Sequence, residues 1–133
     1  MKKEIPETIN LVKRSWILKD MHEVSIVQSL ISIVCNKADE NNLKKINKIS
    51  LRIGEFSGVF EDSIRFAYKA ISKDTIAEGA ELIIEKVYAT AKCDHCDIEF
   101  KISHFNKLCP KCQSFSNNIL SGYELNINTI EGD

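Results

Sequence analysis

The stretch Cys93–Cys112, CDHCDIEFKISHFNKLCPKC, carries two C-x-x-C pairs with twelve residues between them. Each pair brings two thiolates to one side of a tight turn, and two such turns facing each other complete a tetrahedron of sulfurs. Four protein ligands leave no position open for water, so the pattern predicts a closed, structural metal site. We expect Cys93, Cys96, Cys109 and Cys112 to bind one zinc ion.

Iron is the competing metal, because rubredoxin-type sites use a similar pair of turns. Glycine usually follows each pair in those sites, whereas Asp97 and Gln113 stand there in this sequence, which favours zinc. Two redox-active pairs are a further alternative, but no thioredoxin-like context surrounds either one. His95 and His104 lie in the same segment and are interpreted as surface histidines, with ligand exchange or pH sensing as the alternative.

Strand-like alternation of apolar and polar residues flanks the metal segment on both sides. Residues 80–91, AELIIEKVYATA, run directly into the first cysteine pair, and residues 122–130, GYELNINTI, follow the second. A strand that enters the segment and a strand that leaves it predict that the metal-binding unit is an insertion. The residues expected on the inner face are Leu82, Ile84 and Tyr88 in the first strand and Leu125, Ile127 and Thr129 in the second.

Upstream of these strands, the sequence predicts two amphipathic helices joined by a further strand. Residues 23–40 repeat apolar side chains at helical spacing, and Cys35 in that stripe is interpreted as a core thiol. Residues 45–56 alternate as a strand, and residues 57–72 predict the second helix with Ser57 as its N-cap. The residues assigned to the core are Val27, Leu30, Ile31, Val34, Ala38, Ile49, Leu51, Ile53, Phe60, Ile64, Ala67, Tyr68 and Ile71.

Together these elements predict an α+β fold, in which a small mixed β-sheet with two helices carries an inserted zinc-ribbon domain with four cysteine ligands. The expected divisions are an N-terminal extension (1–20), the sheet-and-helix domain (21–91 plus 114–133) and the zinc-binding domain (92–113). The chain has 133 residues and a net charge of −1, so no basic excess points to nucleic acid or to an anionic membrane. No membrane helix or signal peptide is recognised, and a cytoplasmic location is expected.

Five stretches between Met21 and about Glu131 carry a resemblance to a known family. They are MHEVSIVQSL, LRIGEFSGV, EGAELIIE, CDHC…CPKC and SGYELNINTIE, in that order. With them the chain resembles the HypA/HybF family of hydrogenase maturation factors, which are nickel metallochaperones. The resemblance implies a nickel-binding α/β domain, an inserted structural zinc domain and no enzymatic activity. It also implies nickel transfer, with a HypB-type GTPase, to the large subunit of a [NiFe] hydrogenase, and in some organisms to urease through its maturation proteins.

The resemblance places the family's nickel site on Met21, His22 and Glu23. Nickel(II) favours planar nitrogen donors, and a terminal amine, the next amide nitrogen and a second-position imidazole form fused chelate rings. Glu23 can add a carboxylate oxygen or hold the imidazole in place. Outside this family context, a single histidine before a helix is more often a solvated residue of the helix start.

Twenty residues precede Met21, whereas Met-His-Glu is the N-terminus in the relatives that this sequence resembles. The nitrogen of Met21 is therefore an amide, and a planar site that uses an amine cannot form. We expect the functional chain to begin at Met21, with an upstream start codon accounting for the extra residues. The alternative is a genuine extension, in which Ile9, Val12, Trp16 and Ile17 at helical spacing form a short docking helix.

Metal delivery is thus the leading function, and two other classes of protein compete with it. A zinc-ribbon adaptor for nucleic acid or a polymerase is disfavoured, because residues 92–113 contain no arginine and only Phe100 and Phe105 as aromatic residues. A rubredoxin-like electron carrier would be revealed by visible absorbance. We expect a monomer or weak homodimer without a nucleic-acid or membrane partner.

Overall fold

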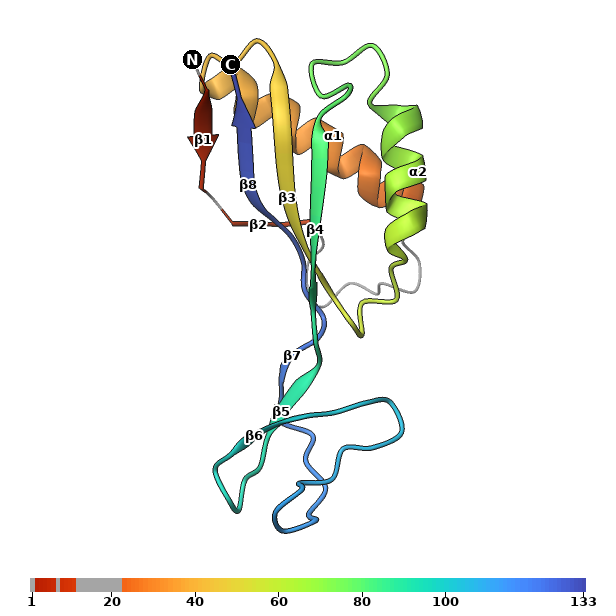
Figure 1. The fold of residues 1–133 in the computed structure, drawn as a ribbon, viewed down its shortest axis with the longest axis vertical. Coiled ribbons are helices and arrows are strands. Elements are labelled where there is room, and N and C mark those ends of the chain that lie inside the picture. Colours follow the sequence, from red (N-terminus) through yellow and green to blue (C-terminus); the bar gives the residue numbers. More distant parts are fainter. Residues whose placement is uncertain (1, 7, 12–22) are drawn as a thin grey trace.

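The computed structural model describes residues 2–6, 8–11 and 23–133, which form two sheets and two helices (Figure 1). In chain order the elements are β1 (Lys3–Ile5), β2 (Ile9–Asn10), α1 (Glu23–Glu40), β3 (Ile46–Gly54), α2 (Glu61–Ile71), β4 (Glu81–Val87), β5 (Thr90–Lys92), β6 (Glu99–Lys101), β7 (Ile119–Ser121) and β8 (Leu125–Gly132). Both helices lie beside the larger sheet, and the smaller sheet lies at the opposite end of the molecule (Figure 1). The predicted α+β class is confirmed.

The larger sheet is organised around β8, the last strand of the chain. On one side β8 pairs antiparallel with β3, which in turn pairs parallel with β4; on the other side it pairs antiparallel with β1 and β2. The chain leaves this sheet after β4, builds the smaller sheet of β5, β6 and β7, and returns as β8. The smaller sheet is therefore inserted between two strands of the larger one.

The inner face of the larger sheet and the two helices enclose one hydrophobic core. The apolar stripe predicted for α1 is buried apart from the half-buried Cys35, and Ile49, Leu51 and Ile53 of β3 are buried as well. This agreement follows from spacing alone, because a period near four places one stripe of a helix inward and a period of two does the same for a strand. Among the described residues, no helix is long and apolar enough to cross a membrane.

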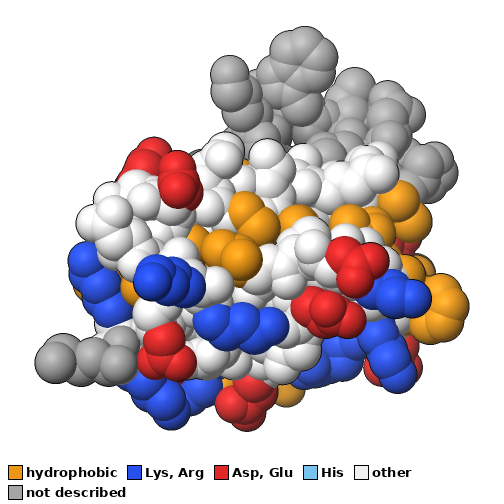
Figure 2. Space-filling model, turned by 90° about the horizontal axis from the view of Figure 1, so that it is seen from above, with side chains coloured by type: hydrophobic (Ala, Val, Ile, Leu, Met, Phe, Trp, Pro, Cys, Tyr) orange, Lys and Arg blue, Asp and Glu red, His pale blue; other side chains and the backbone are white. Residues whose placement is uncertain are grey.

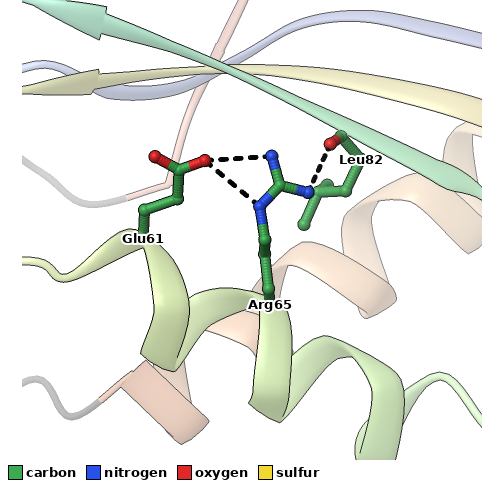
Figure 3. A network of polar contacts seen from close by, with 3 residues as sticks. All are labelled: Glu61, Arg65 and Leu82. Atoms are coloured by element: carbon green, nitrogen blue, oxygen red, sulfur yellow. Dashed lines mark hydrogen bonds and ion pairs between the residues drawn. The ribbon is translucent and has the colours of Figure 1, made fainter.

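Arg65 of α2 ties this helix to the neighbouring strand β4 (Figure 3). Its guanidinium donates a hydrogen bond of 2.7 Å to the backbone oxygen of Leu82. The same group bonds Glu61 one helical turn earlier, at 3.1 and 3.0 Å. The Glu61 contact is an exposed pair and contributes only about 0.3–0.5 kcal/mol. Its main effect is to hold the guanidinium toward β4.

The predicted start of α2 is wrong in two respects. Phe60 occupies the N-cap with an extended backbone and no side-chain cap hydrogen bond, while the Ser57 hydroxyl accepts from the amide of Val59. Phe60 is also 71% exposed and does not join the buried face. The reason is that the chain turns after β3, where the Ser57 amide donates to the oxygen of Gly54 at 3.0 Å, and residues 58–60 are not helical, so the helix begins later than the apolar spacing suggests.

Two strand residues predicted to face inward also lie elsewhere. Tyr88 follows the end of β4 and is 53% exposed, because the chain turns there toward the smaller sheet. Thr129 is displaced by an irregularity in the pairing of β8 with β3, between the partners of Ser50 and Leu51. One extra residue in a ladder moves the next side chain to the other face, so Ile130 takes the buried position after Ile127.

The N-terminal segment contributes two short strands that the sequence did not predict. Ile9 lies in β2, which contradicts the alternative of a helix at that residue; Val12, Trp16 and Ile17 lie outside the described residues. Strands β1 and β2 both pair with β8. The expectation that the functional chain begins at Met21 remains a prediction.

The two sheets meet where Gly54, at the end of β3, passes Gly122, just before β8. Phe56 donates its amide to the oxygen of Gly122 at 2.6 Å, and Gly54 donates to Glu124 at 2.7 Å. A Cβ atom on Gly54 would lie 2.2 Å from the oxygen of Gly122. The smaller sheet spans residues 90–121, and the domain limits 92 and 113 taken from the sequence remain a prediction.

Replacing Gly54 with alanine is therefore expected to lower the free energy of unfolding by about 3 kcal/mol, since backbone must move to admit the methyl group. Gly58→Ala is the matched control, because nothing lies within 4 Å of its added Cβ and only its positive φ of 76° causes strain. That control should cost about 1 kcal/mol. Urea unfolding of both variants measures the difference, and equal losses would contradict this account of the joint.

Candidate metal centre

The four cysteines of the two C-x-x-C pairs come together beside the smaller sheet. Their sulfur atoms all lie within 4.8 Å of one another, and those of Cys93 and Cys112 are 3.6 Å apart. A tetrahedral site with zinc–sulfur bonds of about 2.3 Å requires sulfur–sulfur distances of about 3.8 Å. A small contraction of the cluster would therefore enclose one ion. Among the described residues, no other group of three or more histidine, cysteine or acidic side chains has this proximity.

Both cysteine pairs adopt the same turn. The amide of Asp97 donates to the oxygen of Cys93 at 2.9 Å, and the amide of Gln113 donates to that of Cys109 at 2.8 Å. Asp97 and Gln113 have φ values of 60° and 62°, in the left-handed region that favours glycine. Each residue costs about 1–2 kcal/mol in this conformation. Each turn therefore forms without glycine at its left-handed position. The free energy of binding a metal would offset this conformational strain.

Backbone and side-chain donors point at the sulfur atoms. The Cys96 amide donates to the Cys93 sulfur at 3.3 Å, and the Lys111 amide donates to the Cys109 sulfur at 3.4 Å. Hydrogen bonds from the side chain and backbone of Ser114 lower the pKa of Cys112 to about 6. The hydrogen bond with Cys112 raises the pKa of Cys96 to about 12, so Cys112 is favoured over Cys96 as the thiolate, the form that binds metal.

Burial differs between the two cysteines of each pair. Cys93 and Cys109 are each 1% exposed and belong to the smaller sheet's core, together with Phe56 and Phe100. Cys96 is half-buried and Cys112 is exposed. The first cysteine of each pair therefore fixes the site to the core, and the second leaves a path from solvent.

The fifth cysteine, Cys35, lies in α1 and packs against the core of the larger sheet. Burial raises the pKa of its thiol, which disfavours the thiolate form. Cys35 is not among the clustered sulfurs. This agrees with its interpretation as a core thiol.

Both histidines of the metal segment lie outside the sulfur cluster and are exposed, which agrees with their interpretation as surface histidines. The ring of His104 stacks on Phe56, with ring centroids 4.2 Å apart, and Phe56 also meets the edge of Tyr123 at 5.7 Å. His104 thus connects the metal-binding unit to the loop after β3. Sequence reasoning missed this contact, since no local pattern relates residues 48 positions apart.

Of the residues predicted to bind nickel, Met21 and His22 lie outside the described residues, and Glu23 is the first residue of α1. Glu23 is half-buried and lines a cavity of about 460 Å³ with Asp62 and Phe66 of α2. The fold therefore places the start of α1 beside the first turn of α2. Sequence spacing did not indicate that Asp62 would lie near Glu23.

A protein-family model described as hydrogenase/urease nickel incorporation, metallochaperone, hypA matches residues 21–132. The hydrogenase maturation factor HypA of Chlorobaculum parvum is 41% identical over 110 residues, covering 83% of this chain and 97% of that protein. That of Francisella philomiragia is 42% identical over 110 residues, with the same two shares. The match thus spans nearly the whole length of these relatives.

Two solved structures have the same fold. The solution structure of the Ni metallochaperone HypA from Helicobacter pylori has a TM-score of 0.60 and 28% identity, covering 84% of this chain and 97% of that chain. A second solution structure, of a HypA protein, has a TM-score of 0.62 and 28% identity, with 86% and 98% covered. Residues 1–20 lie outside the family match.

Proposed function

This chain belongs to the HypA family of hydrogenase maturation factors, nickel metallochaperones that are not enzymes, and we propose that it binds nickel through Met21, His22 and Glu23. We propose that it then delivers the metal, with a HypB-type GTPase, to the large subunit of a [NiFe] hydrogenase. Urease, served through its maturation proteins, is a second proposed client. The cytoplasm is the proposed location.

The observation that carries this proposal is the family match from Met21 onward, because it includes both the Met-His-Glu segment and the four cysteines. Imidazole and amide nitrogens suit nickel(II), and His22 supplies one of each. The neighbouring Glu23 carboxylate is half-buried at the first turn of α1. A carboxylate held there can orient the imidazole or complete the ligand set, as an outer partner of a metal site does.

We propose that Cys93, Cys96, Cys109 and Cys112 hold a structural zinc ion. The four sulfurs are close enough to close around one ion, and a closed thiolate set suits zinc. The smaller sheet has three strands of only three residues each, so its core is small. The role of the zinc ion is to stabilise this sheet, and nickel remains at the separate histidine site.

A nucleic-acid adaptor has little support from the surface. On the face shown in Figure 2, Lys and Arg side chains alternate with Asp and Glu, and no continuous basic patch is formed among the described residues. Within the metal-binding unit, the ammonium group of Lys92 lies 2.9 Å from the Asp97 carboxylate. Nucleic acid requires an unopposed positive surface that tracks its phosphates.

The role of the Met21 nitrogen can be tested by comparing nickel titrations of the 133-residue chain and of a chain that starts at Met21. We expect the shorter form to bind at least about tenfold more tightly, a difference of about 1.4 kcal/mol. A free amine closes a five-membered ring with the following amide nitrogen, and absorption spectra should report planar nickel in that form only.

The native start is measured separately, by the intact mass of the protein from its own host. A mass that begins at Met21 is expected. Equal nickel affinity in the two forms, together with a native mass that includes residues 1–20, would show that the amine is not needed.

A further inference from the structure

The outer edge of β8 is covered by the N-terminal segment of the same chain. Strand β1 pairs Lys3, Glu4 and Ile5 with Gly132, Glu131 and Ile130, and β2 pairs Ile9 and Asn10 with Ile127 and Asn126. Leu11 extends the ladder by donating its amide to the oxygen of Leu125 at 2.9 Å. In Figure 1, β1 lies beside the upper half of β8 and β2 crosses near its middle.

This segment also contributes side chains to the main core. Ile5 is 7% and Leu11 is 8% exposed, and both belong to the cluster that contains the fully buried Ile127 and Ile130. The family match begins at Met21, so the two strands are an addition to the matched domain. Without them, the outer edge of β8 would present unpaired backbone groups over a buried apolar row.

The sequence of β8 makes an uncovered edge prone to pair with β8 of a second copy of the chain. Residues 125–130, LNINTI, contain no charge and no proline, and they combine large apolar residues with asparagine. Short uncharged segments of this kind readily add to another strand. The covering segment has the opposite character, because Lys3 and Glu4 are exposed and Pro6 has no amide hydrogen to donate. Charged residues and proline are the usual protection of a sheet edge.

We propose that β1, β2 and Leu11 form an edge guard, which fills the outer edge of β8 and prevents this edge from pairing with β8 of a second copy. When the guard is released, two copies join antiparallel along β8 about a two-fold axis. Each copy has one newly opened edge at β8, so the pairing closes at a dimer. The 133-residue chain remains a monomer, because its guard is held at the edge by covalent connection, whereas a chain that begins at Met21 lacks the guard and forms the dimer. This surface involves no nickel or zinc ligand.

The test uses the full chain with the guard detached by the double substitution Ile5→Asp and Leu11→Asp. Each aspartate would place a charge in the main core, so the guard should leave the sheet while the matched domain stays folded. Light scattering over a range of concentrations should then show the mass rising from 15.1 kDa toward twice that value. Hydrogen exchange should show β8 amides that are protected in the dimer and exposed at high dilution.

Asn10→Asp is the matched control, because it adds one aspartate at an exposed position of the same segment. It should remain a monomer at every concentration. A peptide of residues 1–11 added in excess should return the double variant to a monomer, whereas the same peptide with Ile5→Asp should not. If the double variant loses its helical circular dichroism, Ile5→Ala replaces it, with a smaller shift toward the dimer expected.

Three outcomes would overturn the proposal. The first is a double variant that stays monomeric at all concentrations, and the second is a dimer whose β8 amides exchange freely. The third is association that continues beyond the dimer, because that would require an edge other than β8.

Discussion

Replacing Cys109 with serine is expected to remove zinc and to unfold the metal-binding unit while the larger sheet and both helices persist. Cys109 is 1% exposed and belongs to the small core around Phe56 and Phe100, so it would connect a bound ion to that core. Structural zinc contributes on the order of 10–16 kcal/mol in small peptides, far more than three short strands can supply. Loss of one thiolate should therefore reduce the zinc content from one ion per chain to nearly none.

Zinc content by mass spectrometry and amide exchange resolved along the chain would measure this result. Exchange should become fast for β5, β6 and β7 and remain slow for α1 and β3. Cys35→Ser is the matched control, since it removes the thiol that lies outside the sulfur cluster. It should keep full zinc occupancy. Full occupancy in the Cys109 variant would show that the four-thiolate assignment is wrong.

Changing His22 to alanine is expected to abolish specific nickel binding and hydrogenase maturation. The imidazole is the strongest side-chain donor in the Met-His-Glu segment, so affinity should fall by more than about 100-fold. Zinc content and thermal unfolding should not change, because the four clustered cysteines lie in a different unit of the fold. Nickel titration and hydrogenase activity in a host that lacks its own HypA would measure the two effects.

His95→Ala is the matched control for this experiment. His95 is exposed, lies between the two cysteines of the first pair and is not among the clustered ligands. Its loss should leave nickel binding and maturation close to normal. Normal maturation by the His22 variant would refute delivery through this site, and a parallel loss in the His95 variant would move the nickel site to the metal-binding unit.

Local patterns in the sequence predicted the parts of the fold that depend on near neighbours. The apolar spacing of residues 23–40 predicted α1 with its boundaries, and the alternation of Ile49, Leu51 and Ile53 predicted the inner face of β3. The spacing of Cys93, Cys96, Cys109 and Cys112 predicted which sulfurs would lie together, and the structure brings these four together. In each case the side chains concerned are positioned by a short repeat or a tight turn.

Local patterns failed where a strand met its partner or a turn shifted a helix. Thr129 was predicted to face inward, but an irregularity against β3 gives that position to Ile130. Phe60 was expected in the core, yet the turn before α2 leaves it exposed. Neither residue carries a local signal of its displacement, because the displacement is set by the ladder or turn that surrounds it.

The sequence by itself thus determined the helices, most of the strand faces, the clustered cysteines and the family. Only the tertiary structure decided that β1 and β2 cover the edge of β8, that His104 stacks on Phe56, and that Glu23 and Asp62 line one cavity. These contacts join residues between 39 and 129 positions apart. Their free energy comes from burying surfaces that meet only after the sheet has formed, so no periodicity along the chain records them.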